Sequence, residues 1–241
     1  MKIGHYTDSD LPDNLNNIPE ELTELYKLNS KGYRCPEWTP MPDGKKNVVV
    51  LGCSHTFGQG LAEDEHWVHY LSKFKTDILR YWNLGSPGAS GDRIVRTLYG
   101  CEKIIFPKII IVCWPEWSRR ERLLNHTTSN LAGADEPLRY ETNETDQGNF
   151  LKNIFFVEKF AEKNQCKTFH CFAQDDYTDS LDGLGLMVLE ESLKNTWPYW
   201  SVTGREEITE PSIARDGKHY GKEHHERFAK VFLTKFAYRL K

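Results

Sequence analysis

Short, nearly continuous apolar runs alternate along the chain with longer segments in which apolar residues recur at the spacing of a helix. Such runs, when rich in Val and Ile, are typical of strands that are covered on both faces in a parallel sheet. They lie at 47–51, 78–84, 108–113 and 166–173. The segments with helical spacing lie at 63–74, 90–105, 150–164, 186–194 and 221–240. This alternation predicts an α/β protein with a central, mainly parallel sheet.

Residues 1–45 differ from the rest because they carry several prolines and scattered aromatic residues. One helix is expected at 19–28, where Pro19 suits a first turn and leucines recur at helical spacing. We therefore expect an N-terminal arm that packs on one α/β domain formed by residues 46–241. The arm is also a candidate for contact with the site or with another subunit, so a homo-oligomer is one arrangement that the sequence allows.

A second irregular region is a polar insertion at about 115–149. Residues 125–149 have few apolar side chains and no clear period. Long polar connections inside a compact domain are commonly lids or binding surfaces. We expect this insertion to form a lid or a partner surface.

Length and charge narrow the class of protein. The 241 residues suit one substantial domain. The net charge of -4, with no long run of Lys or Arg, gives no reason to expect nucleic acid or an anionic membrane as a partner. The amino terminus lacks an apolar leader core and no apolar run could span a bilayer, so we expect a cytoplasmic protein. The six cysteines form no CxxC pair, which favours reduced, buried thiols.

The stretch 46–60 carries the first candidate for chemistry. Its apolar run ends at Gly52, and Ser54 follows at the carboxyl end of the predicted strand, where open α/β sheets place their ligands. Gly58 and Gly60 allow a tight loop after it. Ser54 is therefore a candidate nucleophile, although a serine in this place can also simply cap the next helix.

A glycine-rich turn at 83–91 follows the second predicted strand. Backbone N–H groups in such a turn can face an anion or a developing oxyanion. The turn is equally an ordinary connection between strand and helix. The dinucleotide and P-loop fingerprints are absent from the chain, so we expect no nucleotide and no other cofactor.

Near the carboxyl terminus, Asp216 and His219 are three residues apart. In a turn-like segment this spacing can bring the two side chains together, so that the carboxylate orients the imidazole. The same residues with His224 and His225 suggest a metal site as an alternative. We expect none, because adjacent histidines on a helix point in different directions and no zinc spacing is present.

With these residues in view, the chain resembles the SGNH hydrolases, also called the GDSL esterase and lipase family. Residues 51–60, LGCSHTFGQG, look like the first block of that family, with Ser54 at the nucleophile position and Cys53 where the usual motif has Asp. Residues 83–90, NLGSPGAS, resemble the second block, whose glycine supplies an N–H to the oxyanion hole. Gly85 is the first candidate for that glycine and Gly88 is the alternative.

The final block of the family, DxxH, matches residues 216–219, DGKH. The resemblance implies that Asp216 and His219 are the acid and the base of a catalytic triad with Ser54. It also implies a flavodoxin-like three-layer α/β/α sandwich, which agrees with the alternation of predicted strands and helices.

The third block departs from the family. The family has Gly-x-Asn-Asp after the third strand, and its Asn donates to the oxyanion, but this chain reads CWPE at 113–116. Loss of one such donor typically costs ~10²–10³ in turnover. The hole is then either weakened or completed by another group such as Trp114, Ser118 or an arginine of the cluster at 119–122.

The resemblance implies a serine esterase or acyl hydrolase, with the backbone N–H groups of Ser54 and one glycine receiving the oxyanion. We expect a short acyl group, such as acetyl, on a carbohydrate or another small ester. Trp114, Glu116 and Arg119 are the candidates for substrate binding, although the arginine cluster can also be read as a mixed-charge helix face. The second hypothesis is a non-catalytic protein of this fold that binds a glycan or a partner protein. A third is metal-dependent hydrolysis at the histidine cluster.

Overall fold

The structure is a computed structural model, and it describes residues 20–39, 43–124, 127–130, 143–173, 181, 184–189, 193, 199–200, 207–208 and 212–240. Four of its strands run parallel in one central sheet, in the order β2-β1-β3-β6. These strands are β1 (Lys46–Gly52), β2 (Leu79–Gly85), β3 (Pro107–Trp114) and β6 (Lys167–Phe172). The apolar runs in the sequence predicted each of them to within one residue at either end.

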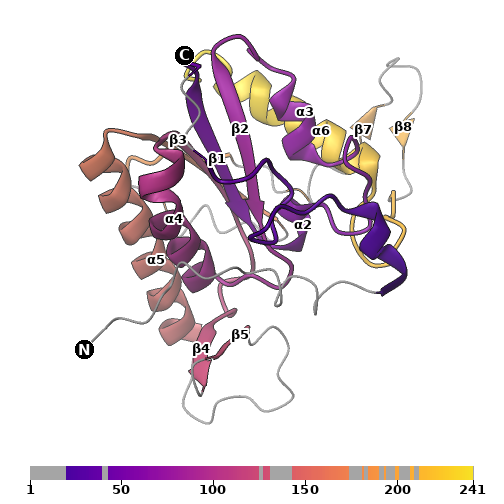
Figure 1. The fold of residues 1–241 in the computed structure, drawn as a ribbon. Helices are drawn as coiled ribbons and strands as arrows, with labels where there is room; N and C mark the ends of the chain where they lie inside the picture. The colour runs from indigo at the N-terminus through magenta and orange to yellow at the C-terminus, as the bar shows by residue number, and fades with distance from the viewer. Residues whose placement is uncertain are drawn as a thin grey trace.

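Helices cover both faces of this sheet (Figure 1). The helices α4 (Gly91–Ile105) and α5 (Asn143–Asn164) lie on one face. The helices α3 (Trp67–Ser72) and α6 (Lys222–Phe236) lie on the other. The protein therefore has the three-layer α/β/α arrangement that the sequence predicted.

The alternation of side chains along β1 divides the core in two. Val49 and Leu51 pack with residues of α4 and α5, whereas Val48 and Val50 pack with residues of α3 and α6. All four side chains are 0% exposed. Burial on both faces explains why the strands read as continuous apolar runs rather than as an alternating pattern.

The carboxyl ends of the strands meet at one edge of the sheet. Gly52, the last residue of β1, pairs with Gly85 of β2 on one side and with Cys113 of β3 on the other. The loops that follow β1, β2 and β3 therefore start side by side. This edge carries the sequence blocks at 51–60, 83–90 and 113–116.

Shorter elements complete the described chain. The 3-10 helix η1 (Glu20–Leu25) lies in the N-terminal arm, and α2 (Ser54–Phe57) follows β1 directly. Two antiparallel pairs lie outside the central sheet. They are β4 (Glu121–Leu124) with β5 (Thr127–Asn130), and β7 (Tyr199–Trp200) with β8 (Glu207–Ile208).

Four predicted helices have different bounds in the structure. The helix expected at 19–28 is the shorter 3-10 helix η1, and the one expected at 221–240 ends at Phe236. The helix expected at 150–164 begins at Asn143, so part of the expected polar insertion is helical. Its first turn is polar because it lies beyond the apolar core, and Asp146 there pairs with Arg120 at 2.9 Å. The helix expected at 63–74 is shortened to α3, since the side chain of His66 accepts the N–H of His69 and caps it.

The helix predicted at 186–194 is wrong for its described residues. The segment from Met187 to Leu189 is extended and runs parallel to β6. His170 N–H donates to the Met187 carbonyl at 2.8 Å, and Leu189 N–H donates to the His170 carbonyl at 2.8 Å. The unpaired edge of β6 needs backbone partners, and this need outweighs the helical spacing of the leucines.

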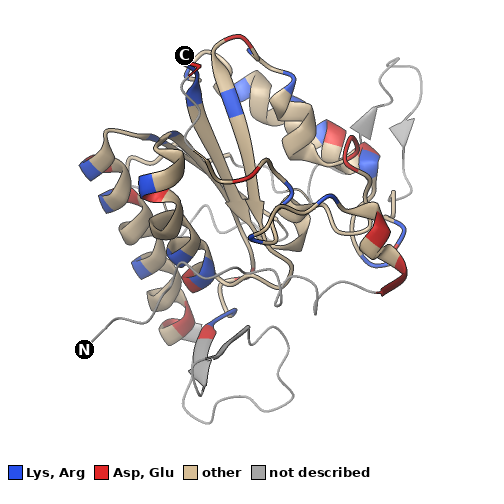
Figure 2. Cartoon of the chain, in the orientation of Figure 1, with Lys and Arg blue, Asp and Glu red and all other residues tan. Residues whose placement is uncertain are grey.

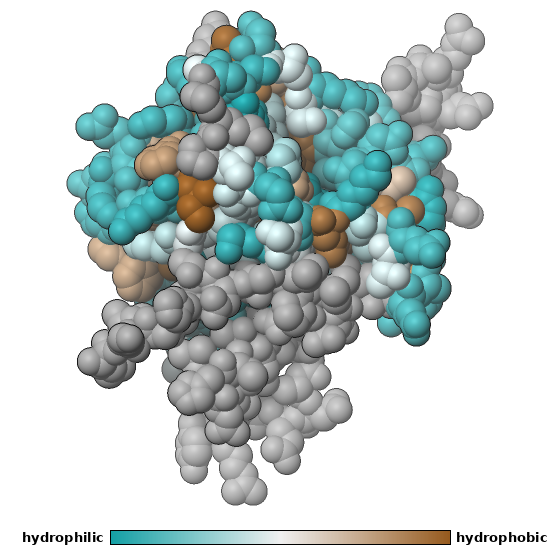
Figure 3. Space-filling view, viewed as in Figure 1, coloured by the Kyte–Doolittle hydropathy of each residue, from teal (hydrophilic) through white to brown (hydrophobic). Residues whose placement is uncertain are grey.

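Charged side chains lie mainly on the helices and loops, and the middle of the sheet is free of them (Figure 2). The described surface seen in Figure 3 is mostly hydrophilic, with small separated apolar patches. Among the described residues, no helix is both long and apolar enough to cross a membrane.

Candidate active site

Ser54 stands where β1 ends and α2 begins. Cys53 has an extended backbone and forms the N-cap of α2, and Ser54 is the first helical residue. The turn is completed at Gly58, whose φ of 81° is one that a residue with a side chain rarely adopts. Ser54 is 6% exposed, so it is set into the edge of the sheet rather than raised above it.

His219 joins Ser54 to Asp216 by hydrogen bonds at both of its ring nitrogens. Nε2 of His219 lies 2.8 Å from Oγ of Ser54, and Nδ1 lies 2.5 Å from Oδ2 of Asp216. Because an ionised carboxylate only accepts, Nδ1 carries the proton. In the neutral imidazole Nε2 is then the acceptor for the Ser54 hydroxyl. The three residues predicted as a triad therefore form one continuous hydrogen-bonded row.

The carboxylate of Asp216 is held ionised and oriented by its own turn. Its Oδ1 accepts the backbone N–H groups of Lys218 at 3.1 Å and His219 at 3.0 Å. Burial acts to raise the pKa of Asp216, but these backbone groups and the His219 ring outweigh it and hold the pKa below its usual value. A carboxylate that stays charged favours the imidazolium form of His219 during proton transfer.

The hydrogen bonds distinguish the two glycines proposed for the oxyanion hole. The N–H of Gly85, the first candidate, donates to Oδ1 of Asn83 at 3.0 Å. A Cβ on Gly85 would lie 2.3 Å from N of Phe57, so this glycine is needed for the close packing of β2 against α2. Gly88 is partly exposed, has a φ of 70°, and makes no described hydrogen bond through its N–H. The alternative candidate, Gly88, is therefore the better donor.

The third block places its aromatic residue away from the solvent. Trp114 is 0% exposed, and its indole N–H donates to Nδ1 of His170 at 2.9 Å. Trp114 therefore has no accessible surface for the substrate-binding role that we expected, and its N–H is not available to an oxyanion. The reason is the apolar layer formed with α5, where the indole packs edge-on against Phe150.

Glu116 and Arg119 lie in the loop that follows β3. Nε of Arg119 is 2.5 Å from Oε2 of Glu116, and their side chains are 17% and 25% exposed respectively. Burial first, and then the charges of His219 and Arg119, lower the pKa of His55 to about 3. The loop that carries Arg119 starts beside the end of β1, which Ser54 and His55 follow. Ser118, the other polar candidate in this loop, is exposed.

His55 packs against the row formed by Ser54, His219 and Asp216. It was assigned no role from the sequence. Its ring meets the His219 ring edge-on, with centroids 5.0 Å apart, and stacks on Tyr220 at 5.2 Å. Tyr220 in turn stacks on His224 at 4.9 Å. The place of His55 immediately after the nucleophile was the available signal.

The metal alternative is not supported by this packing. Nδ1 of His225 accepts the N–H of Trp67 at 3.1 Å, so its ring faces α3. Among the residues that the structure describes, no group of three or more His, Cys, Asp or Glu side chains could hold a metal ion. Asp175 and Asp176, which also follow a predicted strand, lie outside the described residues.

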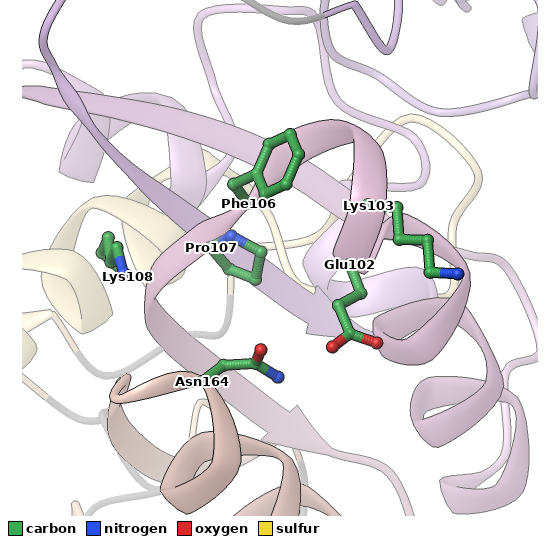
Figure 4. A pocket seen from close by; sticks show the side chains of 6 residues that line it. All are labelled: Glu102, Lys103, Phe106, Pro107, Lys108 and Asn164. Atoms are coloured by element: carbon green, nitrogen blue, oxygen red, sulfur yellow. The ribbon is translucent and has the colours of Figure 1, made fainter.

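A hollow elsewhere on the surface is unconnected with this row (Figure 4). It has a volume of about 150 Å³ and is lined by Glu102, Lys103, Phe106, Pro107, Lys108 and Asn164. Pro107 is the first residue of β3, so the hollow lies at the amino edge of the sheet, whereas Ser54 lies at the carboxyl edge.

Comparison with known proteins gives a fold rather than a close relative. No protein-family model matches the sequence, and no curated protein matches it. Three similar solved structures are TesA, the carbohydrate acetylesterase Est24 from Sinorhizobium meliloti and the psychrotrophic esterase EstA from Pseudoalteromonas sp.. TesA has a TM-score of 0.54 at 13% identity, over 79% of this chain and 98% of its own.

The other two comparisons agree. Est24 has a TM-score of 0.54 at 11% identity, over 81% of this chain and 100% of its own. EstA has a TM-score of 0.52 at 13% identity, over 81% of this chain and 99% of its own. The protein therefore has the fold of the SGNH hydrolases, as the sequence blocks indicated.

Proposed function

We propose that this protein is a serine ester hydrolase of the SGNH type. The observation that carries the proposal is the hydrogen-bonded row of Ser54, His219 and Asp216 at the carboxyl edge of the sheet. A serine hydroxyl is a weak nucleophile by itself, and an adjacent, oriented base is what activates it.

In the proposed reaction, Oγ of Ser54 attacks the ester carbonyl carbon while its proton moves to Nε2 of His219. The backbone N–H groups of Ser54 and Gly88 donate to the resulting oxyanion. Collapse of this intermediate expels the alcohol, which takes the proton from His219, and leaves an acyl group on Ser54. His219 then takes a proton from water as the water attacks the acyl carbon. It returns this proton to Oγ of Ser54 as the bond between Oγ and the acyl carbon breaks and the acid is released.

Arg119 is proposed to compensate for the asparagine that the third block lacks. A guanidinium beside the oxyanion stabilises the developing negative charge through space, and it needs no amide at the end of β3. Arg119 lies in the loop after β3, and this loop starts beside the end of β1, which Ser54 follows; this supports the assignment. We expect Arg119→Ala to lower kcat by ~10²–10³, the usual cost of one oxyanion donor. The matched variant Arg120→Ala, which instead loses an ion pair to Asp146, should keep kcat within a few-fold, and equal losses in both variants would contradict the assignment.

The proposed substrate is a short acyl ester, with an acetyl group on a carbohydrate as the preferred case. Est24, a carbohydrate acetylesterase, shares the fold, which supports this class without defining the sugar. The partly exposed pair of Glu116 and Arg119 is proposed to meet the polar part of the substrate.

The test is an assay of the purified protein against a short-chain aryl ester and acetylated sugars near neutral pH. Ser54→Ala and His219→Ala should each abolish turnover, whereas Ser72→Ala, which removes a hydroxyl from the end of α3, should not. Activity that survives in Ser54→Ala and disappears with a chelator would replace the proposal with metal-dependent hydrolysis.

A second candidate function is favoured by the altered third block. A protein that keeps the row but lacks the amide donor after β3 can serve to bind a glycan or a partner protein without turnover. Complete inactivity of the folded protein on every ester, together with no labelling of Ser54 by a fluorophosphonate, would favour this function. Binding to a glycan array would then be measured directly.

A further inference from the structure

The N-terminal arm sends a buried arginine to the loop that follows Ser54. The side chain of Arg34 is 0% exposed. Its Nη1 donates to the carbonyl oxygens of Phe57 at 3.2 Å, Gly58 at 2.9 Å and Leu61 at 3.1 Å. Its Nε and Nη2 donate to Oε2 of Glu63 at 3.1 and 3.0 Å.

A turn with carbonyl groups directed inward needs donors, because no strand partner is available to it. The planar guanidinium offers five N–H groups in one fixed fork, which suits several acceptors at once. The guanidinium also lies over two aromatic rings, with Tyr26 at 5.0 Å and Phe57 at 5.4 Å from its central carbon. The two rings pack edge-on against each other, with centroids 5.0 Å apart. The arm therefore supplies buried hydrogen bonds to the loop 57–61 and does not merely cover its surface.

Tyr26, at the end of η1, makes a second contact with the same loop. Its hydroxyl accepts the N–H of Gly60 at 2.7 Å. The carbonyl of Gly60 accepts the N–H of Arg215 at 3.1 Å. A Cβ on Gly60 would lie 2.8 Å from Cβ of Ala214 and 3.1 Å from Cγ of Asp216. Residue 60 is therefore wedged between the arm and the segment that carries Asp216, and Figure 1 shows the indigo arm beside the yellow segment before α6.

The same loop returns to the nucleophile. The N–H groups of Gly58 and Gln59 both donate to the carbonyl oxygen of Ser54, at 2.8 and 3.0 Å. Gly58 and Gly60 have φ values of 81° and 78°, so the loop keeps this path only with glycine at both positions. A shift of the loop would move the Ser54 backbone at one end and the Asp216 segment at the other.

We propose that Arg34 and Tyr26 are positioning residues, which hold the loop 57–61 so that Ser54 and Asp216 keep the alignment needed for attack. This proposal rests on the function proposed above. It assigns to the arm a part in the reaction, although neither residue touches the reacting atoms. Misplacement of a nucleophile by about 1 Å typically costs ~10²-fold in rate, so small changes in this loop should be visible in kinetics.

The experiment compares Tyr26→Phe and Arg34→Lys with the control Arg80→Gln. Arg80 lies at the amino end of β2, far from the loop 57–61, and the control variant loses only its ion pair to Asp43. For each variant, kcat and KM on the aryl ester, the rate of Ser54 labelling by a fluorophosphonate and the unfolding midpoint are measured. We expect Tyr26→Phe to lower kcat and the labelling rate about tenfold with KM changed less than twofold. Arg34→Lys should lower both rates further, and Arg80→Gln should leave them within twofold of the wild type.

A purely stabilising role makes a different prediction. If the two arm variants have a lower unfolding midpoint but unchanged kcat per folded molecule, the proposal is overturned. A chemical complement tests the same point, since methylguanidinium at non-denaturing concentration should restore part of the labelling rate of Arg34→Ala. No recovery, with the variant folded, would also count against the proposal.

Hydrogen exchange distinguishes a failure of the proposed esterase function from a failure of the positioning role. If the wild type neither turns over an ester nor reacts with the fluorophosphonate, the exchange rates of the Gly58, Gln59 and Gly60 amides are compared instead. The two arm variants should exchange these amides at least tenfold faster than the wild type, and Arg80→Gln should not. Unchanged exchange rates would overturn the proposed role of Arg34 and Tyr26 in holding the loop 57–61, whatever the protein catalyses.

Discussion

Mild acid should destabilise this protein strongly, because four of its histidines are buried as neutral rings. His55, His66, His224 and His225 are 1% to 4% exposed. Burial is the largest cause that lowers each pKa, to about 3 for His55 and to about 4 for His66 and His224. The pKa of His225 is lowered far below its usual value by burial and by the neighbouring histidines.

Acid lowers the free energy of unfolding because the unfolded chain binds more protons than the folded protein. Between pH 6.5 and the lowered folded pKa, the unfolded chain binds protons at these rings and the folded protein does not. The free energy of unfolding therefore falls as pH decreases below about 6.5. Over the interval from pH 7 to pH 5, each ring contributes a loss of about 2 kcal/mol. Four rings give about 8 kcal/mol, which is comparable with the ~5–15 kcal/mol stability of a whole domain.

The assay is urea unfolding at pH 7, 6.5, 6, 5.5 and 5, at constant ionic strength and followed by circular dichroism. The decisive variant is His225→Gln, whose amide oxygen can still accept the Trp67 N–H but cannot titrate. It should lose about 2 kcal/mol less than the wild type between pH 7 and pH 5. The control His69→Gln, at a partly exposed ring, should have a smaller effect. Equal stability of the wild type at pH 7 and pH 5 would refute the effect of the buried rings. So would a His225→Gln variant whose free energy of unfolding falls with pH as steeply as that of the wild type.

Three further variants test individual contacts. Asp216→Asn should fold normally but lower kcat by about 10⁴, because an amide does not fix the proton on Nδ1 of His219 as a carboxylate does; steady-state kinetics with near-normal activity would contradict the assigned role. Gly85→Ala should destabilise by about 3 kcal/mol or more in urea unfolding, because its Cβ would meet backbone atoms of Phe57 at 2.3 and 2.9 Å. Trp114→Phe should cost ~1–3 kcal/mol by leaving Nδ1 of His170 without its donor, while KM stays within twofold; a large rise in KM would restore a role in substrate binding.

The sequence was sufficient for the sheet because its strands are buried on both faces. A strand such as β1, with four consecutive side chains at 0% exposure, admits little except apolar residues, so its bounds are visible in the pattern alone. The neighbours of Ser54 were predictable for a related reason. In a parallel sheet the loops after successive strands start at one edge, so a serine after β1 and a glycine turn after β2 must lie together.

Helix ends and the segment after β6 were harder, because contacts distant in sequence decide them. The first turns of α5 have no apolar period, and their helix is supported by the pairing of Asp146 with Arg120. The segment from Met187 to Leu189 has helical spacing but takes its backbone hydrogen bonds from His170. Neither partner is visible in a window of local sequence, since the partners are 26 and about 17 residues away.

The oxyanion hole shows the same limit at the level of single atoms. Gly85 ends β2 and Gly88 lies in the turn that follows it, and the sequence put Gly85 first and Gly88 second as the donor. What separates them is Asn83, whose side chain accepts the Gly85 N–H and whose amide donates to the Thr56 carbonyl. This asparagine joins β2 to α2, so it positions the helix that begins at Ser54 while its side chain occupies the Gly85 N–H. In the proposed reaction, the choice of donor therefore depends on the hydrogen bonds of a neighbouring residue, and Gly88 is the glycine whose N–H we propose for the oxyanion.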